Sequence, residues 1–300
     1  MHELVSFNGE VLRAEEARVA AAGGASLYGR GAFTTVAVYR GRPFLWDAHW
    51  SRLVEHARRA GVEHDFAEGD VTAALGRLLE ANGVGRGRAR VSLLAREGSG
   101  VWRRPGAGGA GGAGGEAKAE AQGEGRDGAD LLIMTGDARR DDGRTLALTV
   151  SPHRLNTLSP LAGVKSTSYL EHLMAWEEAR SRDFDEAVVL NERGEVASAS
   201  MANLFWVSRG TIHTPALATG AMAGTTRARV IELAQEMAFP VVEGAHGLRE
   251  LAEAEEIFLT SAGLGLGLVT AFDFHRYTVP VGSVALRLHE AFRQLTLGAM

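Results

Sequence analysis

In LAGVKSTSYLEHLMAWEEA, residues 161–179, an apolar segment runs directly into a helical pattern with Lys165 at the junction. Only two of the 32 basic residues are lysines, and the other, Lys118, lies in a Gly/Ala/Glu tract without core-forming residues. Lysine can lose its proton and attack a carbonyl, whereas arginine cannot. The scarcity of lysine therefore suggests a chemical role for Lys165, with a solvated surface lysine as the ordinary alternative.

The composition limits the functions that the chain can have. Its 300 residues, 45% of them hydrophobic, can bury one large core or two ordinary ones. A formal net charge of −5 and scattered arginines give no field that would attract nucleic acid. With no apolar run long enough for a membrane span and no signal-peptide pattern, we expect a cytoplasmic protein. Cysteine is absent and the histidines lack metal-ligand spacing, so no metal is expected.

The N-terminal part alternates strand and helix patterns. Asn8-Gly9 and Arg40-Gly41 each stand between two β-rich runs, which is typical of hairpins. Asp47 is expected to cap a helix that stops at Gly61. These elements predict an α+β unit.

The Gly/Ala-rich segment 106–128 has almost no large apolar residues, so we expect a disordered loop between two strands of one sheet. We expect a small N-terminal α+β domain over residues 1–137 and a linker over 138–144. The remainder, 145–300, combines hairpins with helices and predicts a larger α/β domain.

The segment GAMAGTTRARVIELAQEMAF places Gly224, Thr225 and Thr226 at the first turn of a predicted helix. Unpaired amides and the positive end of the helix dipole attract a phosphate at such a turn. An ordinary threonine cap is the more common arrangement for this segment taken alone.

A second anion site is predicted after the strand pattern IFLTS, where the amides of Ser261 and Ala262 lie in a tight turn. The following GLGLG run has the wrong spacing for a dinucleotide fingerprint, so we reject NAD binding. Arg52 offers a bidentate contact to the same phosphate, with a solvated helix arginine as the alternative.

A helix N-terminus for a phosphate and one retained lysine are what pyridoxal 5′-phosphate (PLP) requires. Four segments carry a more specific pattern: YGRGAFTT (28–35), AHWSRL (48–53), LALTVSPHRLNTLSPLAGVKSTSYLEHLMAWEEA (146–179), and MANLFWVSRGTIHTP with the later AGTTR (201–227). In their order and spacing they resemble the class IV aminotransferase family of fold-type IV PLP enzymes, and within it the 4-amino-4-deoxychorismate lyases.

The resemblance implies a role for each matching residue. Lys165 would form the Schiff base with PLP and then move the α-proton of the substrate. Tyr169 is expected one helical turn after Lys165, facing the cofactor or lying in the core. The phosphate would be held by Arg52, Gly224, Thr225, Thr226, Ser261 and Ala262.

The chain departs from the family pattern in three places. Ser198 aligns with the glutamate that pairs with the pyridine nitrogen, and Glu195 would point to the opposite face of the strand. A serine can only donate a hydrogen bond to a neutral nitrogen, so the ring becomes a weaker electron sink. Ala262 replaces a frequent threonine, and Arg30 replaces an aspartate at the edge of the active-site opening. Tyr28 and Arg154 are further candidates for substrate contacts. The sequence alone does not decide which arginines bind the substrate carboxylates among Arg30, Arg90, Arg103, Arg104 and Arg154.

The resemblance also implies the overall fold and the reaction. It predicts an α/β (α+β), two-domain, D-amino acid aminotransferase-like homodimer with its active site between the domains. The implied reaction eliminates pyruvate from 4-amino-4-deoxychorismate to give 4-aminobenzoate, a step of folate synthesis. Transamination of branched-chain or D-amino acids is an alternative. A non-catalytic PLP-fold relative is another, motivated by Ser198, Ala262 and Arg30.

Overall fold

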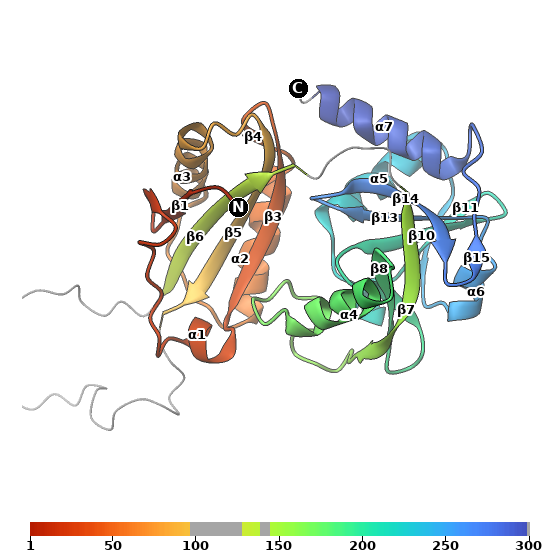
Figure 1. The fold of residues 1–300 in the computed structure, drawn as a ribbon, viewed down its shortest axis with the longest axis horizontal. Coiled ribbons are helices and arrows are strands. Elements are labelled where there is room, and N and C mark those ends of the chain that lie inside the picture. The colour runs from red at the N-terminus through yellow and green to blue at the C-terminus, as the bar shows by residue number, and fades with distance from the viewer. Residues whose placement is uncertain (97–127, 139–144, 299–300) are drawn as a thin grey trace, which may run out of the picture.

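Two β-sheets lie side by side in the computed structural model, each covered by helices (Figure 1). The structure describes residues 1–96, 128–138 and 145–298. The loop expected at 106–128 and the linker expected at 138–144 lie outside the described residues, apart from Gly128 and Ala138. Within the described ranges, no helix is both long and apolar enough to cross a membrane. The predicted mixture of helices and strands is confirmed.

The first sheet has six strands in the order β2-β1-β6-β5-β3-β4. The predicted turns at Asn8-Gly9 and Arg40-Gly41 are confirmed, since all four residues have the positive φ that such hairpins require. The elements of this part are β1 (Leu4–Phe7), β2 (Glu10–Arg13), α1 (Gly24–Tyr28), β3 (Gly31–Tyr39), β4 (Arg42–Pro43), α2 (Trp46–Arg59), α3 (Glu68–Ala81), β5 (Arg86–Ala95) and β6 (Ala129–Asp137).

The two faces of the first sheet have different tasks. On one face, residues such as Val36 of β3 pack with Leu53 of α2 in an apolar core. Side chains alternate along a strand, so the strand residues next to these core positions point to the opposite face, toward the second sheet. That face bears Phe33 of β3 and, on β5, Arg88 and Arg90, all of which line a cavity. The core thus fixes which residues reach the space between the sheets.

Helix α2 begins at Trp46, and the prediction that Asp47 caps it is wrong. The N-cap residue is Leu45, which has a φ of 56°, and no side chain caps this end. Asp47 instead lies in the first turn, where a negative charge suits the helix dipole. Gly61, with a φ of 65°, follows the end of the helix as predicted.

The second sheet has the strand order β12-β11-β10-β13-β14-β7-β8-β9, with β15 beside β14. Helices α5 and α7 pack against one face around Phe205 and Phe258, and Trp206 belongs to a second core on the other face. The elements are β7 (Leu146–Leu155), α4 (Leu170–Ser181), β8 (Glu186–Asn191), β9 (Val196–Ala199), β10 (Asn203–Ser208), β11 (Thr211–Pro215), η2 (Leu217–Thr219), α5 (Thr225–Glu236), β12 (Val241–Gly244), α6 (Leu248–Ala252), β13 (Glu256–Ser261), β14 (Gly265–Phe272), β15 (His275–Arg276) and α7 (Val284–Gly298).

Lys165 lies in the connection between two parallel strands. Strands β7 and β8 are parallel neighbours, so the chain must cross over between them, and α4 forms part of that crossover. Lys165 precedes α4, whose N-cap residue is Tyr169. The expectation that Tyr169 lies one helical turn beyond Lys165 is therefore wrong, because the helix starts only after Tyr169.

Replacing Leu53 with alanine should destabilise the protein. Leu53 is fully buried between α2 and the first sheet, so the change leaves a cavity and should lower the free energy of unfolding by about 2–5 kcal/mol. Leu27→Ala is a matched control, since Leu27 is 44% exposed and its loss should cost less than about 0.5 kcal/mol. Urea denaturation of both variants measures the difference, and equal midpoints would contradict this view of the core.

Candidate active site

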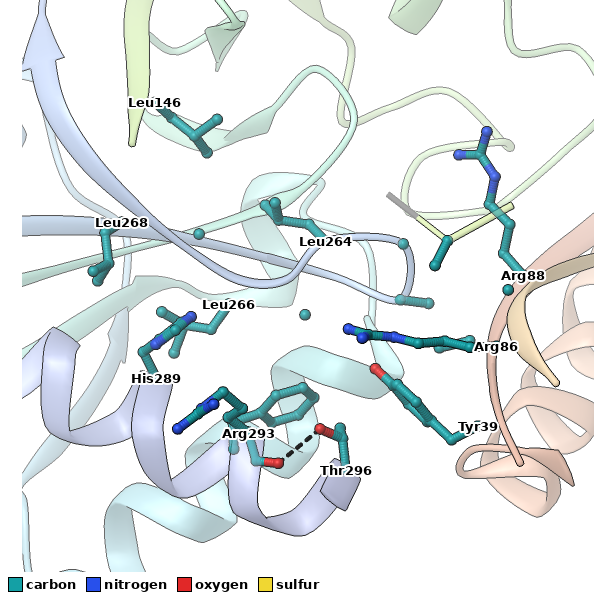
Figure 2. A pocket seen from close by; sticks show the side chains of 18 of the residues that line it. Tyr39, Arg86, Arg88, Leu146, Leu264, Leu266, Leu268, His289, Arg293 and Thr296 are labelled. Atoms are coloured by element: carbon teal, nitrogen blue, oxygen red, sulfur yellow. Dashed lines mark hydrogen bonds between the residues drawn. The ribbon is translucent and has the colours of Figure 1, made fainter. Parts of the chain in front are cut away.

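Two neighbouring cavities lie between the sheets, and they share Arg88 and the turn from Ala262 to Leu264. The smaller has a volume of about 450 Å³. Figure 2 shows Tyr39 and Arg86 reaching into it from the first sheet, with His289 and Arg293 on α7 at the opposite wall. The larger has a volume of about 660 Å³ and contains Lys165.

Buried polar atoms without partners identify the larger cavity as the candidate site. Three of its lining residues, Arg52, Ser198 and Thr260, have a buried side-chain atom that makes no hydrogen bond within the described part of the chain. Among the described residues that line the smaller cavity, none has such an atom. Because buried polar groups are normally paired, these atoms indicate a polar ligand in the larger cavity.

The backbone of Lys165 is fixed to the first sheet and its helix. Its amide donates to Nδ1 of His56 on α2 at 2.9 Å, and its carbonyl accepts from the amide of Phe33 on β3, also at 2.9 Å. Thr167 continues this pairing by donating its amide to the carbonyl of Gly31. The crossover of the second sheet is thereby held against β3, which determines where the lysine side chain enters the cavity.

The amine of Lys165 has a lowered pKa. Burial and the positive charges of Arg52 and Arg90 lower its pKa to about 7. Its Nζ lies 3.5 Å from the hydroxyl oxygen of Tyr169 and 4.6 Å from the centre of the Phe33 ring. The amine is therefore present in both protonation states near neutral pH.

Tyr169 faces the same cavity as the lysine. Its ring packs edge-on against Phe33 and stacks on His172, with centroids 5.2 and 4.4 Å away. Burial, with the Glu186 carboxylate as a second cause, raises the pKa of Tyr169 to about 12, so its hydroxyl keeps its proton. Of the two roles for Tyr169 left open by the sequence, the structure favours a residue at the cavity wall.

The N-terminus of α5 opens into the cavity without a cap. Its N-cap residue, Gly224, has no side chain, and within the described residues the amides of Thr225 and Thr226 donate no hydrogen bond. Both threonines are buried and line the cavity. A buried helix end with unpaired amides needs a partner, and an anion satisfies both the amides and the dipole.

Gly224 is required at this position by its neighbour. A Cβ atom on Gly224 would lie 2.0 Å from Oδ1 of Asn203, which is closer than any side chain allows. Asn203 is itself held by a hydrogen bond of 2.8 Å from its side-chain amide to the carbonyl of Met222. The contact explains why a glycine, which has no side chain to cap the amides, stands at the N-cap of α5.

Two further sets of donors surround the same part of the cavity as the open end of α5, and together these donors form an anion cradle. Arg52 donates one bond to the carbonyl of Ala223 and one to the hydroxyl of Thr34, while its buried Nε has no partner in the described chain. In the turn after β13, the amides of Ala262 and Gly263 likewise donate to no described residue. All six residues that the sequence suggested for the phosphate line this cavity. Ser261, whose amide was predicted to point at the anion, belongs to β13 and pairs with Gly265 of β14, and the open amides are those of Ala262 and Gly263.

Ser198 lies in the cavity wall on β9, buried and with its hydroxyl unpaired among the described residues. Glu195 does not replace it, because its carboxylate accepts hydrogen bonds from Arg193 and Asn191 outside the cavity. The only carboxylate among the described lining residues is Glu186, which accepts from the hydroxyl of Ser200 and the amide of Met201.

The predicted substrate residues are not in the cavity of this chain. Tyr28 and Arg154 are exposed outside it, and Arg30 donates to the carbonyls of Ala60 and Gly61 at the end of α2. The reason for Arg30 is electrostatic, because the carbonyl end of a helix attracts a cation.

Two arginines of β5 reach the cavity instead. Arg88 and Arg90 line it, and the guanidinium of Arg90 lies 3.5 Å from the centre of the Phe33 ring. The sequence suggested Arg90 as one of several candidates and missed Arg88. Arg88 and Arg90 are two residues apart on β5, so they lie on the same face of the sheet. Once that face is known to meet the cavity, strand alternation predicts both.

The donors of this cavity fit PLP. The open end of α5, the turn after β13 and Arg52 suit a phosphate, and a lysine with a depressed pKa suits an aldehyde. The unpaired hydroxyl of Ser198 offers a hydrogen bond to a ring nitrogen.

Comparison with known proteins agrees with this chemistry. The family model "Amino-transferase class IV" matches residues 31–272. An aminodeoxychorismate lyase of Bacillus subtilis is 26% identical over 297 residues, 97% of this chain and 94% of that protein. The crystal structure of a branched-chain aminotransferase from Thermoproteus uzoniensis with norvaline has a TM-score of 0.84 at 25% identity, covering 99% of this chain and 96% of that one.

A branched-chain amino acid aminotransferase from T.th., solved with N-(5′-phosphopyridoxyl)-L-glutamate, shares the fold with a TM-score of 0.81. It is 24% identical, and the match covers 100% of this chain and 95% of that one. The predicted fold-type IV architecture is therefore confirmed. Since the family model spans most of its length, the chain belongs to the class IV aminotransferases, which are PLP-dependent enzymes.

Proposed function

We propose that the chain is a PLP-dependent lyase that eliminates pyruvate from 4-amino-4-deoxychorismate to give 4-aminobenzoate. The observation that carries the proposal is one cavity in which the Lys165 amine, the open end of α5 and two arginines of β5 meet. When bound, PLP supplies an aldehyde that condenses with amines and a ring that takes up the electron pair left when a proton is removed. The phosphate would be held by Thr225, Thr226 and Arg52.

Lys165 would remove the proton from the carbon that bears the substrate amine. With a pKa of about 7, the amine can accept a proton and return it at neutral pH. The hydroxyl of Tyr169, which stays protonated, can donate a hydrogen bond to an acceptor next to the lysine amine. As the proton leaves, the bond between the ring and the enol-ether oxygen breaks and the ring of the substrate becomes aromatic. The released enolpyruvate takes up a proton and becomes pyruvate.

Ser198 favours elimination over transamination. Its hydroxyl can donate a hydrogen bond to the ring nitrogen but cannot keep that nitrogen protonated. The cofactor ring would then be a weaker electron sink. Full transamination depends more on a strong electron sink than elimination does. Aromatisation of the product supplies driving force that compensates for the weaker sink.

Arg88 and Arg90 suit the same substrate. 4-Amino-4-deoxychorismate carries two carboxylates, whereas a branched-chain amino acid carries one. Two guanidinium groups from one strand can each pair with a carboxylate. An apolar wall would serve a branched side chain better than a second cation does.

Transamination of a branched-chain or D-amino acid is the second candidate, favoured by the likeness to branched-chain aminotransferases. A non-catalytic relative is less well supported, since the retained lysine has the depressed pKa of a reactive amine. We further propose a cytoplasmic homodimer in folate synthesis, with domains at 1–137 and 145–300 joined by a linker at 138–144.

The purified protein should release pyruvate and 4-aminobenzoate from 4-amino-4-deoxychorismate without any added 2-oxo acid. Chromatography of both products measures the reaction. Lys165→Ala should reduce the rate by about 10²- to 10⁴-fold, because the proton transfer is lost. Absolute dependence on a 2-oxo acid would instead support an aminotransferase, and a protein that stays colourless with added PLP would support a non-catalytic relative.

Reductive trapping should report the lowered pKa of Lys165. With pyridoxal and borohydride, labelling of Lys165 should rise with pH around a midpoint near 7, because only the neutral amine attacks the aldehyde. Arg90→Gln removes a positive charge and should move the midpoint to higher pH. Arg30→Gln, outside the cavity, is the matched control and should leave it unchanged. Peptide mapping that finds no label on Lys165 would refute the assignment.

Arg88→Ala should raise the KM for 4-amino-4-deoxychorismate by about tenfold, with a smaller effect on kcat, because one carboxylate loses its partner. The increase in KM should stay modest because Arg88 is exposed to solvent, which weakens its pairing with a carboxylate. Arg154→Ala, which removes an arginine outside the cavity, should change neither constant. Steady-state kinetics on the three proteins distinguish these outcomes, and an unchanged KM in Arg88→Ala would remove this arginine from substrate binding.

A further inference from the structure

His49 of α2 connects the two sheets through both of its ring nitrogens. The residue is 1% exposed. Its Nδ1 lies 2.7 Å from the hydroxyl of Thr34 on β3, and its Nε2 lies 3.0 Å from the hydroxyl of Thr225 at the start of α5. The imidazole therefore contacts Thr225, the first residue of the uncapped helix α5.

The surroundings of Thr34 decide which nitrogen carries the proton. Arg52 can only donate, so the hydroxyl oxygen of Thr34 accepts from its Nη2 at 2.9 Å. Thr34 is fully buried, and among the described residues its hydroxyl has only Arg52 and His49 as partners. Its proton must therefore go to Nδ1 of His49, because the other arrangement leaves a buried hydroxyl proton unpaired.

This assignment determines what Thr225 can do. If Nδ1 accepts from Thr34, Nε2 carries the ring proton and donates it to the oxygen of Thr225. The Thr225 hydroxyl then has its own proton free for a partner in the cavity. In the opposite tautomer the Thr225 proton would point to His49, and only lone pairs would face an anion.

We propose that His49 is a positioning residue that makes the Thr225 hydroxyl a hydrogen-bond donor to the cofactor phosphate. The inference rests on the proposed phosphate site at α5 and adds a residue that touches no ligand itself. A neutral imidazole is required, and burial together with the charge of Arg52 lowers the pKa of His49 to about 3. The order of donors runs from Arg52 through Thr34 and His49 to Thr225.

The test compares pyridoxine 5′-phosphate with pyridoxine, which differ only in the phosphate and lack the aldehyde that reacts with Lys165. Calorimetry on the full-length, cofactor-free protein gives both dissociation constants. His49→Phe should weaken binding of pyridoxine 5′-phosphate roughly 10- to 100-fold, as expected for a lost hydrogen bond to a charged group. Pyridoxine should be affected less than about twofold. His49→Gln, which can still donate to Thr225, should keep most of the phosphate preference.

Two controls separate positioning from general disruption. His213→Phe changes a histidine that stacks on Trp206 away from the cavity, and it should leave both constants unchanged. In a Thr225→Val background, His49→Phe should cause no additional loss for the phosphorylated ligand, because His49 acts through Thr225. Equal weakening of both ligands by His49→Phe, or independent losses at positions 49 and 225, would overturn the proposal.

The tautomer of His49 can be observed directly in the wild-type protein. In full-length protein labelled with ¹⁵N at histidine, the His49 ring should show a protonated Nε2 and a bare Nδ1, and the reverse would overturn the inference. Failure of the proposed phosphate site is distinguishable. In that case the wild-type protein itself would bind pyridoxine 5′-phosphate no better than pyridoxine.

Discussion

The structure depends on the attachment of one peptide segment of the second sheet to the first. Lys165 is held through its amide by His56 and through its carbonyl by Phe33, so the crossover after β7 cannot move independently of α2 and β3. This attachment brings the amine close to Arg52 and Arg90, whose charges, with burial, lower its pKa. The lowered pKa of the lysine is thus a consequence of how the two sheets are joined.

Helix α2 extends this connection along the cavity. His49, Arg52 and His56 lie on one side of the helix and bond to Thr225, Ala223 and Lys165 of the second part of the chain. The same helix therefore positions both the anion cradle and the lysine. Unpaired donors at the buried start of α5 carry a free-energy cost, which a bound phosphate would remove by accepting their hydrogen bonds.

Local patterns were sufficient for much of the fold. The hairpins at Asn8-Gly9 and Arg40-Gly41 were indicated by a glycine between two β-rich runs, and the scarcity of lysine singled out Lys165. Contacts between distant residues were not predictable. Helical spacing places His49 on the same face as Trp46 and Leu53, but it does not reveal the partner Thr225, which is 176 residues away. Arg88 was missed because strand alternation groups residues by face without saying which face meets the cavity.

Ser198 has a second consequence through the charges of the cavity. A glutamate at this position would place a negative charge near Lys165 and raise its pKa, because an opposite charge favours the protonated amine. With serine there, Glu186 is the only described carboxylate of the lining, and Arg52, Arg88 and Arg90 leave the cavity positive. The amine then loses its proton more readily, and a ligand with several negative charges is attracted. The weaker electron sink expected with serine, the lowered pKa of Lys165 and the positive lining of the cavity would suit the proposed elimination from a substrate with two carboxylates better than transamination of an apolar amino acid.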